Sequence, residues 1–483
     1  MDWILILELL YLIFIISVCL RIIFDTDNVS KTLGYLLVVI FLPIIGVFIY
    51  FSFGVNYRKN KLYTKKITKD KKQQKLIIAK LNEYNTQNEK LLETNSNFSR
   101  LAKMLYQTDR SPLTCNNSVE LLINGEEKFP AVIQELKKAK NHIHIEYYIY
   151  EDDDIGKKIE EILISKAQAG VEVRFIYDDF GSSSIRKHLV KRLLKGGVRA
   201  YPFYKIKLIP LANRINYRNH RKIIVIDGLT SFVGGINISD KYSNATIGNK
   251  LYWRDTHLKL KGPITTLLQR TFIADWNFCS SETLPIEAGY FPAFDSLPPI
   301  GDKLVQIAAS GPDSDHPTIY YSIVEAILSA KKEVFLTSPY FIPGETIMDA
   351  LIMASLSGVK IKLLLPGISD SFFVNAASRS YFKNLLQAGV EIYLYQKGFV
   401  HAKTLVADRC LSIVGTANLD YRSFDLNFEV NAVIYDEEMG EKLAQVFEQD
   451  LLDAKIVDLD RWLKRPKMKQ LLEKTIRLIS PLL

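Results

Sequence analysis

HRKIIVID at residues 220–227 and HAKTLVAD at residues 401–408 are two copies of one pattern, and this pattern decides the fold. Each copy carries Lys two residues after the His, Asp at +7, Gly at +14 and Asn at +17. Chance rarely produces such agreement in a chain of 483 residues with seven histidines. We therefore expect one site built from two related halves.

The sequence around the two motifs repeats as well. AKNHIHIEYYIY from Ala139 matches AKKEVFLTSPYF from Ala330, and the segments around Gly170 and Gly358 match each other, as do those around Gly197 and Gly389. In the matched segments a helix with apolar residues at spacings of three and four ends at Gly, and a β-branched strand follows. The predicted fold class is therefore α/β, with two repeated units that can pack about a pseudo-twofold axis.

The motif strands place each His and its Lys on one face, because positions i and i+2 of a strand project to the same side. The Asp at +7 has the opposite parity, and we interpret it as mainly a turn residue. The Asn at +17 returns beside the His, and the Gly before it leaves room for a ligand or backbone. The predicted site set is His220, Lys222, Asp227, His401, Lys403 and Asp408, supported by Gly234, Asn237, Gly415 and Asn418.

Two imidazoles, two lysines and two amides suit an anionic tetrahedral centre that gains charge in the transition state. One imidazole can attack phosphorus, while the other protonates the leaving alkoxide and later deprotonates the incoming alcohol. A nucleophilic imidazole also needs a carboxylate on its second nitrogen. Asp255 and Glu429, each downstream of the His of its own half, are the candidates, and a solvated strand charge is the alternative for each. The motifs leave open which His is attacked.

The N-terminus contains two apolar runs, from Trp3 to about Leu20 and from Gly34 to Gly54. Each can cross the roughly 30 Å hydrocarbon core as a helix, so residues 1–57 are predicted to form a two-helix transmembrane hairpin. A cleaved signal peptide is the alternative, but no positive n-region precedes the first run. The basic residues at 58–75 then mark the cytoplasmic side and place the rest of the chain there.

The formal net charge of +9 favours an anionic partner without choosing among lipid, phosphate and nucleic acid. The four cysteines have no CxxC spacing, and His142 and His144 lie in an alternating stretch that is typical of a structural strand face. We therefore predict no metal and no cofactor.

The doubled HxKxxxxD motif resembles the phospholipase D superfamily, and nearly the whole chain, including the SGPD segment at residues 310–313, resembles its bacterial cardiolipin synthases. The resemblance implies two α/β/α sandwich domains and a metal-independent phosphatidyl transfer, in which two phosphatidylglycerol molecules give cardiolipin and glycerol. It also implies that His220 is the nucleophile and His401 the general acid and base, with the lysines and asparagines of both motifs on the phosphate oxygens. The implied partners are membrane lipids, and no nucleic acid.

The domain boundaries that follow are 58–110 for a basic juxtamembrane and helical connector, 111–285 for the first domain, 286–303 for a linker and 304–483 for the second domain. A hydrolase of membrane phospholipids is the alternative function, because water and alcohol can both resolve a phosphohistidine. A nuclease and a non-catalytic membrane scaffold are weaker alternatives, since the chain carries an apolar hairpin and two intact motifs. The oligomeric state is left open.

Two further patterns have two interpretations each. The C-terminal stretch from Arg461 alternates basic and apolar residues at helical spacing, so it either lies on the lipid surface or, as we favour, packs its Leu and Ile face on the second domain. Phe341, Phe372 and Phe373 could line an acyl groove, but core packing is the expectation for each.

Overall fold

The computed structural model describes residues 3–26, 29–51, 97–205, 217–246, 251–284, 289–292 and 299–478. These residues belong to two compact units, the N-terminal helices and the α/β body. The predicted basic segment at 58–75, most of the connector and half of the linker at 286–303 lie outside the described residues.

The N-terminal unit contains α1 (Trp3–Asp25), α2 (Val29–Phe41) and α3 (Pro43–Ile49). α1 has 23 residues, and among the described residues it is the helix long and apolar enough to cross a membrane. The second apolar run does not form the continuous helix that we predicted. It is divided before Pro43, and a Cβ on Gly46 would lie 2.5 Å from the Val38 carbonyl oxygen, so the chain folds back there.

The α/β body begins with α5 (Ser99–Asp109). The elements of the first half follow: β1 (Thr114–Ile123), α6 (Asn124–Lys138), β2 (His142–Tyr147), α7 (Asp154–Gln168), β3 (Glu172–Tyr177), α8 (Leu189–Lys195), β4 (Arg199–Pro202), β5 (Arg218–Asn219), β6 (Lys222–Ile226), β7 (Thr230–Gly234), β8 (Tyr252–Arg254), β9 (Thr256–Lys261) and α9 (Thr265–Cys279).

The second half repeats most of this order, with additional helices inside it and further elements at its C-terminal end. Its elements are β10 (Lys303–Ser310), α10 (Thr318–Ser329), β11 (Glu333–Thr337), α11 (Gly344–Leu356), β12 (Lys360–Pro366), α12 (Phe372–Arg379), α13 (Phe382–Gln387), β13 (Glu391–Tyr395), β14 (Gly398–Val400), β15 (Thr404–Ala407), β16 (Leu411–Gly415), α14 (Tyr421–Asp425), β17 (Asn427–Tyr435), α15 (Glu437–Leu452), β18 (Ala454–Ile456), α16 (Leu459–Leu463) and α17 (Lys467–Leu478).

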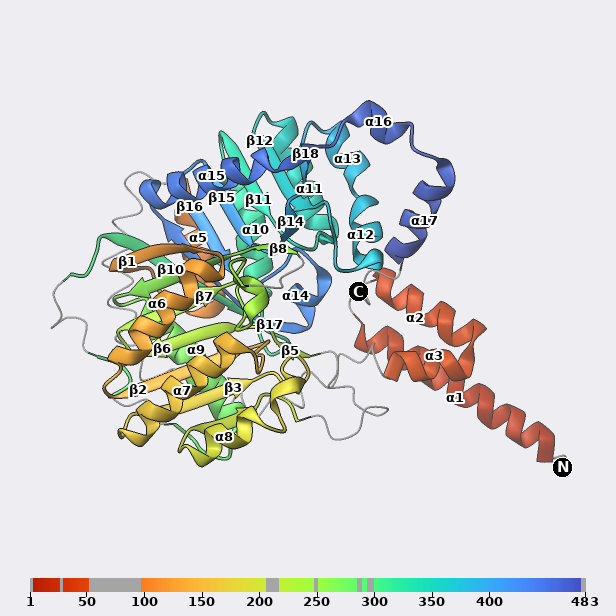
Figure 1. The fold of residues 1–483 in the computed structure, drawn as a ribbon. Coiled ribbons are helices and arrows are strands. Elements are labelled where there is room, and N and C mark those ends of the chain that lie inside the picture. Colours follow the sequence, from red (N-terminus) through yellow and green to blue (C-terminus); the bar gives the residue numbers. More distant parts are fainter. Residues whose placement is uncertain are drawn as a thin grey trace. The chain divides into compact units, whose positions relative to one another are not determined.

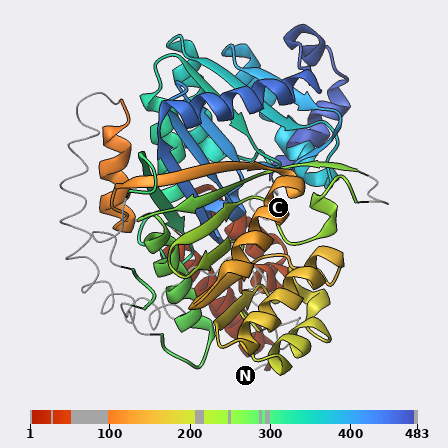
Figure 2. The ribbon, with the colours of Figure 1, turned by 60° about the vertical axis from the view of Figure 1, so that its left-hand side comes forward.

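Strands of both halves form one sheet, and β1 and β10 pair antiparallel where the halves meet. From this junction the first half continues β9-β7-β6-β2-β3-β4, and the second continues β17-β16-β15-β11-β12-β13-β18. Corresponding strands therefore take corresponding places on the two sides of the junction. In Figure 2 the long strand β1 runs between the first-half helices and the second half of the chain.

The predicted helix ends are confirmed by backbone geometry, because the glycine after the helix has positive φ in each matched segment. The values are 90° for Gly170, 89° for Gly197, 94° for Gly358 and 92° for Gly389. Each half also has its own apolar core, and a third core combines strands of both, with Val225 and Leu258 in the same cluster as Val414 and Val430. The two halves therefore share a buried interface as well as a sheet.

Candidate active site

Each motif histidine follows a short strand that pairs in parallel with a strand of the other half. β5, which ends at Asn219, pairs with β17 so that Asn219 lies opposite Phe428. β14, which ends at Val400, pairs with β8 so that Val400 lies opposite Arg254. One step further along each pair, His220 lies opposite Glu429 and His401 lies opposite Asp255, because parallel strands advance together.

The backbone at these positions also crosses between the halves. The N–H of His220 donates to the Phe428 carbonyl oxygen at 3.0 Å, and the N–H of His401 donates to the Arg254 carbonyl oxygen at 2.7 Å. Main-chain hydrogen bonds therefore fix both histidines in addition to the contacts of their side chains.

Both candidate carboxylates contact a histidine, but not the one we predicted. The Nδ1 atom of His220 lies 2.9 Å from Glu429 Oε2, and the Nδ1 atom of His401 lies 2.6 Å from Asp255 Oδ2. The prediction that each carboxylate serves its own half is wrong, because the strand pairing exchanges the partners. The alternative of a solvated strand charge is excluded, since both carboxylates are fully buried.

The two carboxylates have different surroundings. Glu429 Oε2 also accepts a hydrogen bond from Thr416 Oγ1 at 2.5 Å, and Oε1 accepts one from Asn427 Nδ2 at 3.2 Å. Burial alone raises the pKa of Glu429, but the charge and hydrogen bond of His220, with help from Lys222 and Thr416, lower it below its ordinary value. For Asp255 burial outweighs the nearby cations and raises the pKa to about 6.

The site concentrates buried basic groups. Burial lowers the pKa of Lys222 to about 7 and that of Lys403 to about 8, and each ammonium lowers the pKa of its neighbours. Burial also lowers the pKa of His220 to about 4 and holds that of His401 well below its ordinary value, with a further contribution from Lys403. An anion bound here would reverse these shifts, since an opposite charge favours each protonated form.

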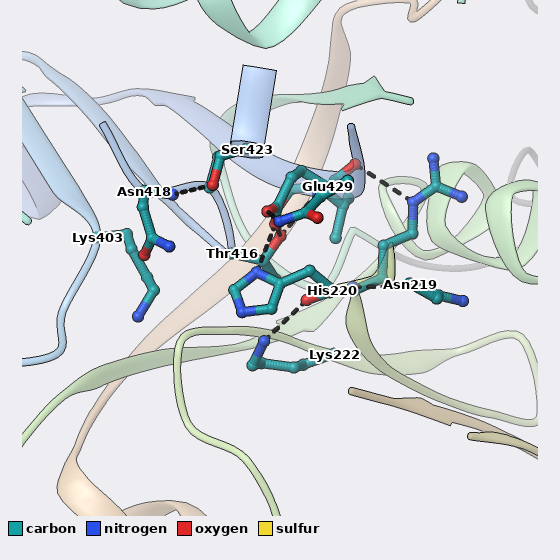
Figure 3. Close-up of polar contacts among 12 residues, drawn as sticks. Asn219, His220, Lys222, Lys403, Thr416, Asn418, Ser423 and Glu429 are labelled. Atoms are coloured by element: carbon teal, nitrogen blue, oxygen red, sulfur yellow. Dashed lines mark hydrogen bonds and ion pairs between the residues drawn. The ribbon is translucent and has the colours of Figure 1, made fainter. Parts of the chain in front are cut away.

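The lysines lie beside the rings, as strand parity predicts. Lys222 Nζ donates to the His220 carbonyl oxygen at 2.8 Å, and Lys403 Nζ lies 2.9 Å from His401 Nδ1. Figure 3 shows that the second ring nitrogen of His220 points away from Glu429, toward the side on which Lys222 and Lys403 lie. The site can therefore direct the unprotonated Nε2 atom of His220 and the ammonium groups of Lys222 and Lys403 toward one bound anionic group.

The Asp of each motif holds a turn. The Asp227 carboxylate accepts hydrogen bonds from the N–H groups of Lys140, Asn141 and His142, all between 2.7 and 2.9 Å. The Asp408 carboxylate accepts the corresponding bonds from residues 331–333 at 2.7 to 3.0 Å. Asp227 fixes the loop before β2 and Asp408 the loop before β11, which is the structural role that their parity predicts.

The two motif asparagines differ. Asn237 Nδ2 donates to the Tyr242 hydroxyl at 2.7 Å, and its Oδ1 accepts from the Ile149 N–H at 3.2 Å. The Asn418 side-chain oxygen is buried and has no hydrogen-bond partner among the described residues. Of the two motif asparagines, Asn418 is therefore the one whose side-chain oxygen has unused hydrogen-bonding capacity among the described residues.

The motif glycines make room for backbone. A Cβ on Gly234 would lie 2.6 Å from the Cα of His257 on β9, and one on Gly415 would lie 2.4 Å from the Val430 carbonyl oxygen on β17. Neighbouring strands occupy that space, so these glycines support the site by allowing close strand packing.

Two buried arginines near the carboxylates were not among the predicted site residues. Arg221 pairs with Asp275 on α9, and its Nε donates to the Glu429 carbonyl oxygen at 3.2 Å. Arg254 pairs with Asp450 on α15 at 2.8 Å, and its Nη1 donates to the Asp255 carbonyl oxygen at 2.7 Å. Arg221 follows His220 and Arg254 precedes Asp255 in the sequence. This adjacency is the sequence feature that could have identified them as site residues.

Other predictions have mixed outcomes. His142 and His144 are buried on β2 and contact Gln269, which confirms the structural interpretation. Phe341 is buried in the core as expected. Phe372 and Phe373 are 66% and 53% exposed, so their predicted core packing is wrong.

Comparison with known proteins agrees with this geometry. Residues 132–276 and 323–451 match the family described as cardiolipin synthase, PLD-like domain, and residues 9–54 match the phospholipase D-nuclease N-terminal family. The chain belongs to the cardiolipin synthase family of phospholipase D-like enzymes. Each of the two matched PLD-like regions contains one complete His-Lys motif.

Relatives of this family match the chain over nearly its whole length. The chain is 39% identical to the major cardiolipin synthase ClsA of Bacillus subtilis (strain 168), over 98% of this chain and 99% of that protein. It is 40% identical to a cardiolipin synthase of Alkalihalophilus pseudofirmus, over 99% of this chain and 94% of that protein. It is an enzyme of phospholipid metabolism and a phosphatidyltransferase by this relationship.

A solved structure extends the comparison to the fold. The crystal structure of a phosphatidylserine synthase from Haemophilus influenzae Rd KW20 superposes with a TM-score of 0.56 at 15% identity, covering 80% of this chain and 100% of that one. The likeness supports the mixed α/β phospholipase D-like fold.

Proposed function

We propose that this cardiolipin synthase joins two phosphatidylglycerol molecules through a phosphohistidine on His220, with His401 as general acid and base. The observation that supports the proposal most is the pair of crossed imidazole–carboxylate contacts beside two buried lysines. Lys222, Lys403 and the Nδ2 group of Asn418 donate hydrogen bonds to the phosphate oxygens, and Asn237 supports the site through Tyr242.

In the first step the Nε2 atom of His220 attacks the phosphorus of one phosphatidylglycerol. The bond from phosphorus to the head-group oxygen breaks, and this oxygen takes a proton from His401, so that glycerol leaves. In the second step His401 takes the proton of a terminal hydroxyl on another phosphatidylglycerol. That oxygen attacks phosphorus, the N–P bond breaks, and cardiolipin is released. The same steps in reverse make the reaction reversible.

The assignment of the two roles rests on the unequal carboxylates. A phosphohistidine carries positive charge on its ring, and Glu429, whose pKa lies below its ordinary value, is ionised to stabilise it. Asp255, with a pKa raised to about 6, stabilises a cation on His401 less strongly, so that His401 releases its proton more readily. The negative charge of a bound substrate phosphate raises the pKa of His401, so that the ring takes up from solvent the proton that it must donate.

The setting in the membrane is also part of the proposal. α1 crosses the bilayer, and the basic residues at 58–75 keep the catalytic body on the cytoplasmic side. The repeated strand order favours a pseudo-twofold axis between the halves. No nucleic acid and no metal takes part in this reaction.

The test is to give the purified chain phosphatidylglycerol alone in mixed micelles and to separate the products. We expect cardiolipin and glycerol in equal amounts. Phosphatidic acid as the main product would favour the hydrolase instead, and a requirement for a nucleotide-activated lipid would refute the mechanism.

A further inference from the structure

α17 exposes an apolar stripe along its whole length. The stripe begins at Met468 and continues three, four and ten residues later with Leu471, Leu472 and Leu478. These spacings place the four side chains on one face of the helix. All four are exposed, Leu471 to 57% and Leu478 to 77%. The favoured prediction, that this Leu face packs on the second domain, is therefore wrong.

The rest of α17 shows why the stripe faces outward. Glu473 and Ile476 are the buried residues of the helix. Glu473 lies on the side away from the stripe, and Ile476 lies at its edge, one turn after Leu472. Glu473 pairs with Arg465 at 2.7 Å, and Ile476 packs against Ala376 and Ala377 of α12. Turning the Leu face inward would expose Ile476 and break this buried ion pair.

α12 adds a second exposed apolar group beside α17. Phe372 and Phe373 begin the helix and contact each other edge to face, with 5.7 Å between ring centroids. Both are mostly exposed, whereas Ala376 and Ala377, one turn later in the helix, are buried. Figure 1 shows α12 and α17 side by side, with the last turn of α17 next to the first turn of α12.

Contacts connect this pair of helices to the active site. Asp370, two residues before Phe372, accepts a hydrogen bond from the Tyr340 hydroxyl at 2.6 Å. The Tyr340 ring lies 6.4 Å from that of Phe399, which lies 5.8 Å from the His401 ring. Asp370, Tyr340 and Phe399 therefore connect the exposed aromatic end of α12 to His401.

The charge of the same region is strongly one-sided. Residues 461–478 contain seven basic residues and one acidic residue, Glu473, whose charge is already paired with Arg465. An apolar face with basic flanks is complementary to a bilayer of anionic phospholipid. A soluble partner would need an acidic surface, whereas the proposed substrate of this enzyme is itself an anionic membrane lipid.

We propose that α12 and α17 form a docking surface for an anionic phospholipid bilayer. The exposed residues Phe372, Phe373, Met468, Leu471, Leu472 and Leu478 enter the interface, and the basic side chains contact the head groups. This surface is a second membrane contact besides α1, and it holds the site against the layer from which substrate enters. The inference rests on the proposed function, because the lipid it binds is the lipid that the site consumes.

The first test follows the environment of residue 472. In a full-length chain whose four native cysteines are replaced by Ser, an environment-sensitive dye is attached to Leu472→Cys. The matched control is the same dye on Leu194→Cys in α8, because the Leu194 side chain is similarly exposed. We expect a blue shift at 472, and none at 194, in nanodiscs that contain phosphatidylglycerol compared with phosphatidylcholine alone. A dye at 472 that stays in water overturns the proposal. A shift that instead grows with protein concentration in detergent also overturns it, in favour of contact between copies of the chain.

The second test uses native cysteines and a ratio of rates. Leu471→Glu/Leu472→Glu should lower the ratio of the rate on bilayer phosphatidylglycerol to the rate on soluble short-chain phosphatidylglycerol by about tenfold, since two charges then oppose insertion. Leu194→Glu/Leu452→Glu, at two exposed leucines elsewhere, should leave the ratio within about twofold. An unchanged ratio in the first variant contradicts the docking surface. Failure of the wild-type chain to make cardiolipin from either substrate contradicts the proposed function instead.

Discussion

The two half-sites have the same construction and different electrostatics. In each, a short parallel strand pair brings a histidine to a buried carboxylate of the other half. Glu429 gains hydrogen bonds from Thr416 and Asn427, and its pKa is lowered, whereas the pKa of Asp255 is raised to about 6. A duplicated scaffold can therefore supply two different chemical roles, because the partners of its carboxylates have diverged.

The largest effects are expected at the histidines themselves. His220→Gln and His401→Gln should each lower kcat by about 10⁴-fold or more, and the double variant should be little worse, because groups that act as one unit are not additive. Steady-state cardiolipin synthesis measures this. If the loss of kcat in the double variant equalled the product of the two single losses, the histidines would act independently and a shared site would be contradicted.

Removing the carboxylate charge should separate the two half-sites. Glu429→Gln should lower kcat by about 10³-fold, because the phosphohistidine loses its counter-charge, and Asp255→Asn by about 10²-fold, because only proton transfer is impaired. Thermal unfolding of both variants serves as the control for folding. Equal losses would show that the halves are not specialised as proposed.

The buried arginines are positioning residues, and they should affect stability and rate separately. Asp450→Asn leaves the Arg254 cation without its partner and should lower the free energy of unfolding by about 3 kcal/mol. Arg254→Met/Asp450→Leu should recover most of that stability, because no charge remains unpaired. The double variant should still be about tenfold slower, since the Asp255 carbonyl loses one of its two hydrogen bonds and keeps only that from the Asn124 N–H. Full recovery of kcat would reduce the pair to a purely structural role.

The last prediction concerns the free-energy cost of burying the Lys222 ammonium. Because the folded-state pKa of Lys222 is lowered to about 7, the unfolded chain binds more protons than the folded chain from there up to pH 10.5. The contribution of Lys222 to the free energy of unfolding therefore rises from pH 7 to pH 10.5. Below pH 7 the buried ammonium destabilises the fold by its full amount. Lys222→Met should be more stable by about 3 kcal/mol at pH 6, with the advantage declining toward pH 10. Exposed Lys360→Met is the control, and a gain independent of pH would contradict burial of the Lys222 ammonium as the cause.

Local patterns in the sequence predicted the parts of the fold that depend on local physics. The positive φ of Gly170 and Gly358 follows from a helix that ends before a strand, and the turn role of Asp227 follows from strand parity. The repeated segments around the motifs likewise predicted two matching α/β units, which appear in the strand order.

The failures concern contacts between segments that are distant in the chain. Glu429 and His220 are 209 residues apart, and their pairing depends on the two-residue strand β5, which has too few residues for a periodic signal. The amphipathic pattern of α17 predicted a helix correctly but not which face the domain would cover, since that depended on Arg465, Glu473 and α12. Pro43 divided an apolar run whose composition alone suited a single span.

The central claim, that each histidine works with the carboxylate of the other half, is tested most directly by burst kinetics on a phosphatidyl ester of p-nitrophenol. This leaving group needs no general acid, so the burst reports the attack by His220 alone. We predict a burst equal to the enzyme concentration in His401→Ala and none in His220→Ala. Glu429→Gln should slow the burst by about 10²-fold or more, whereas Asp255→Asn should leave its rate within about threefold and slow only the later turnover. A burst that Asp255→Asn slows and Glu429→Gln does not would contradict the crossed pairing.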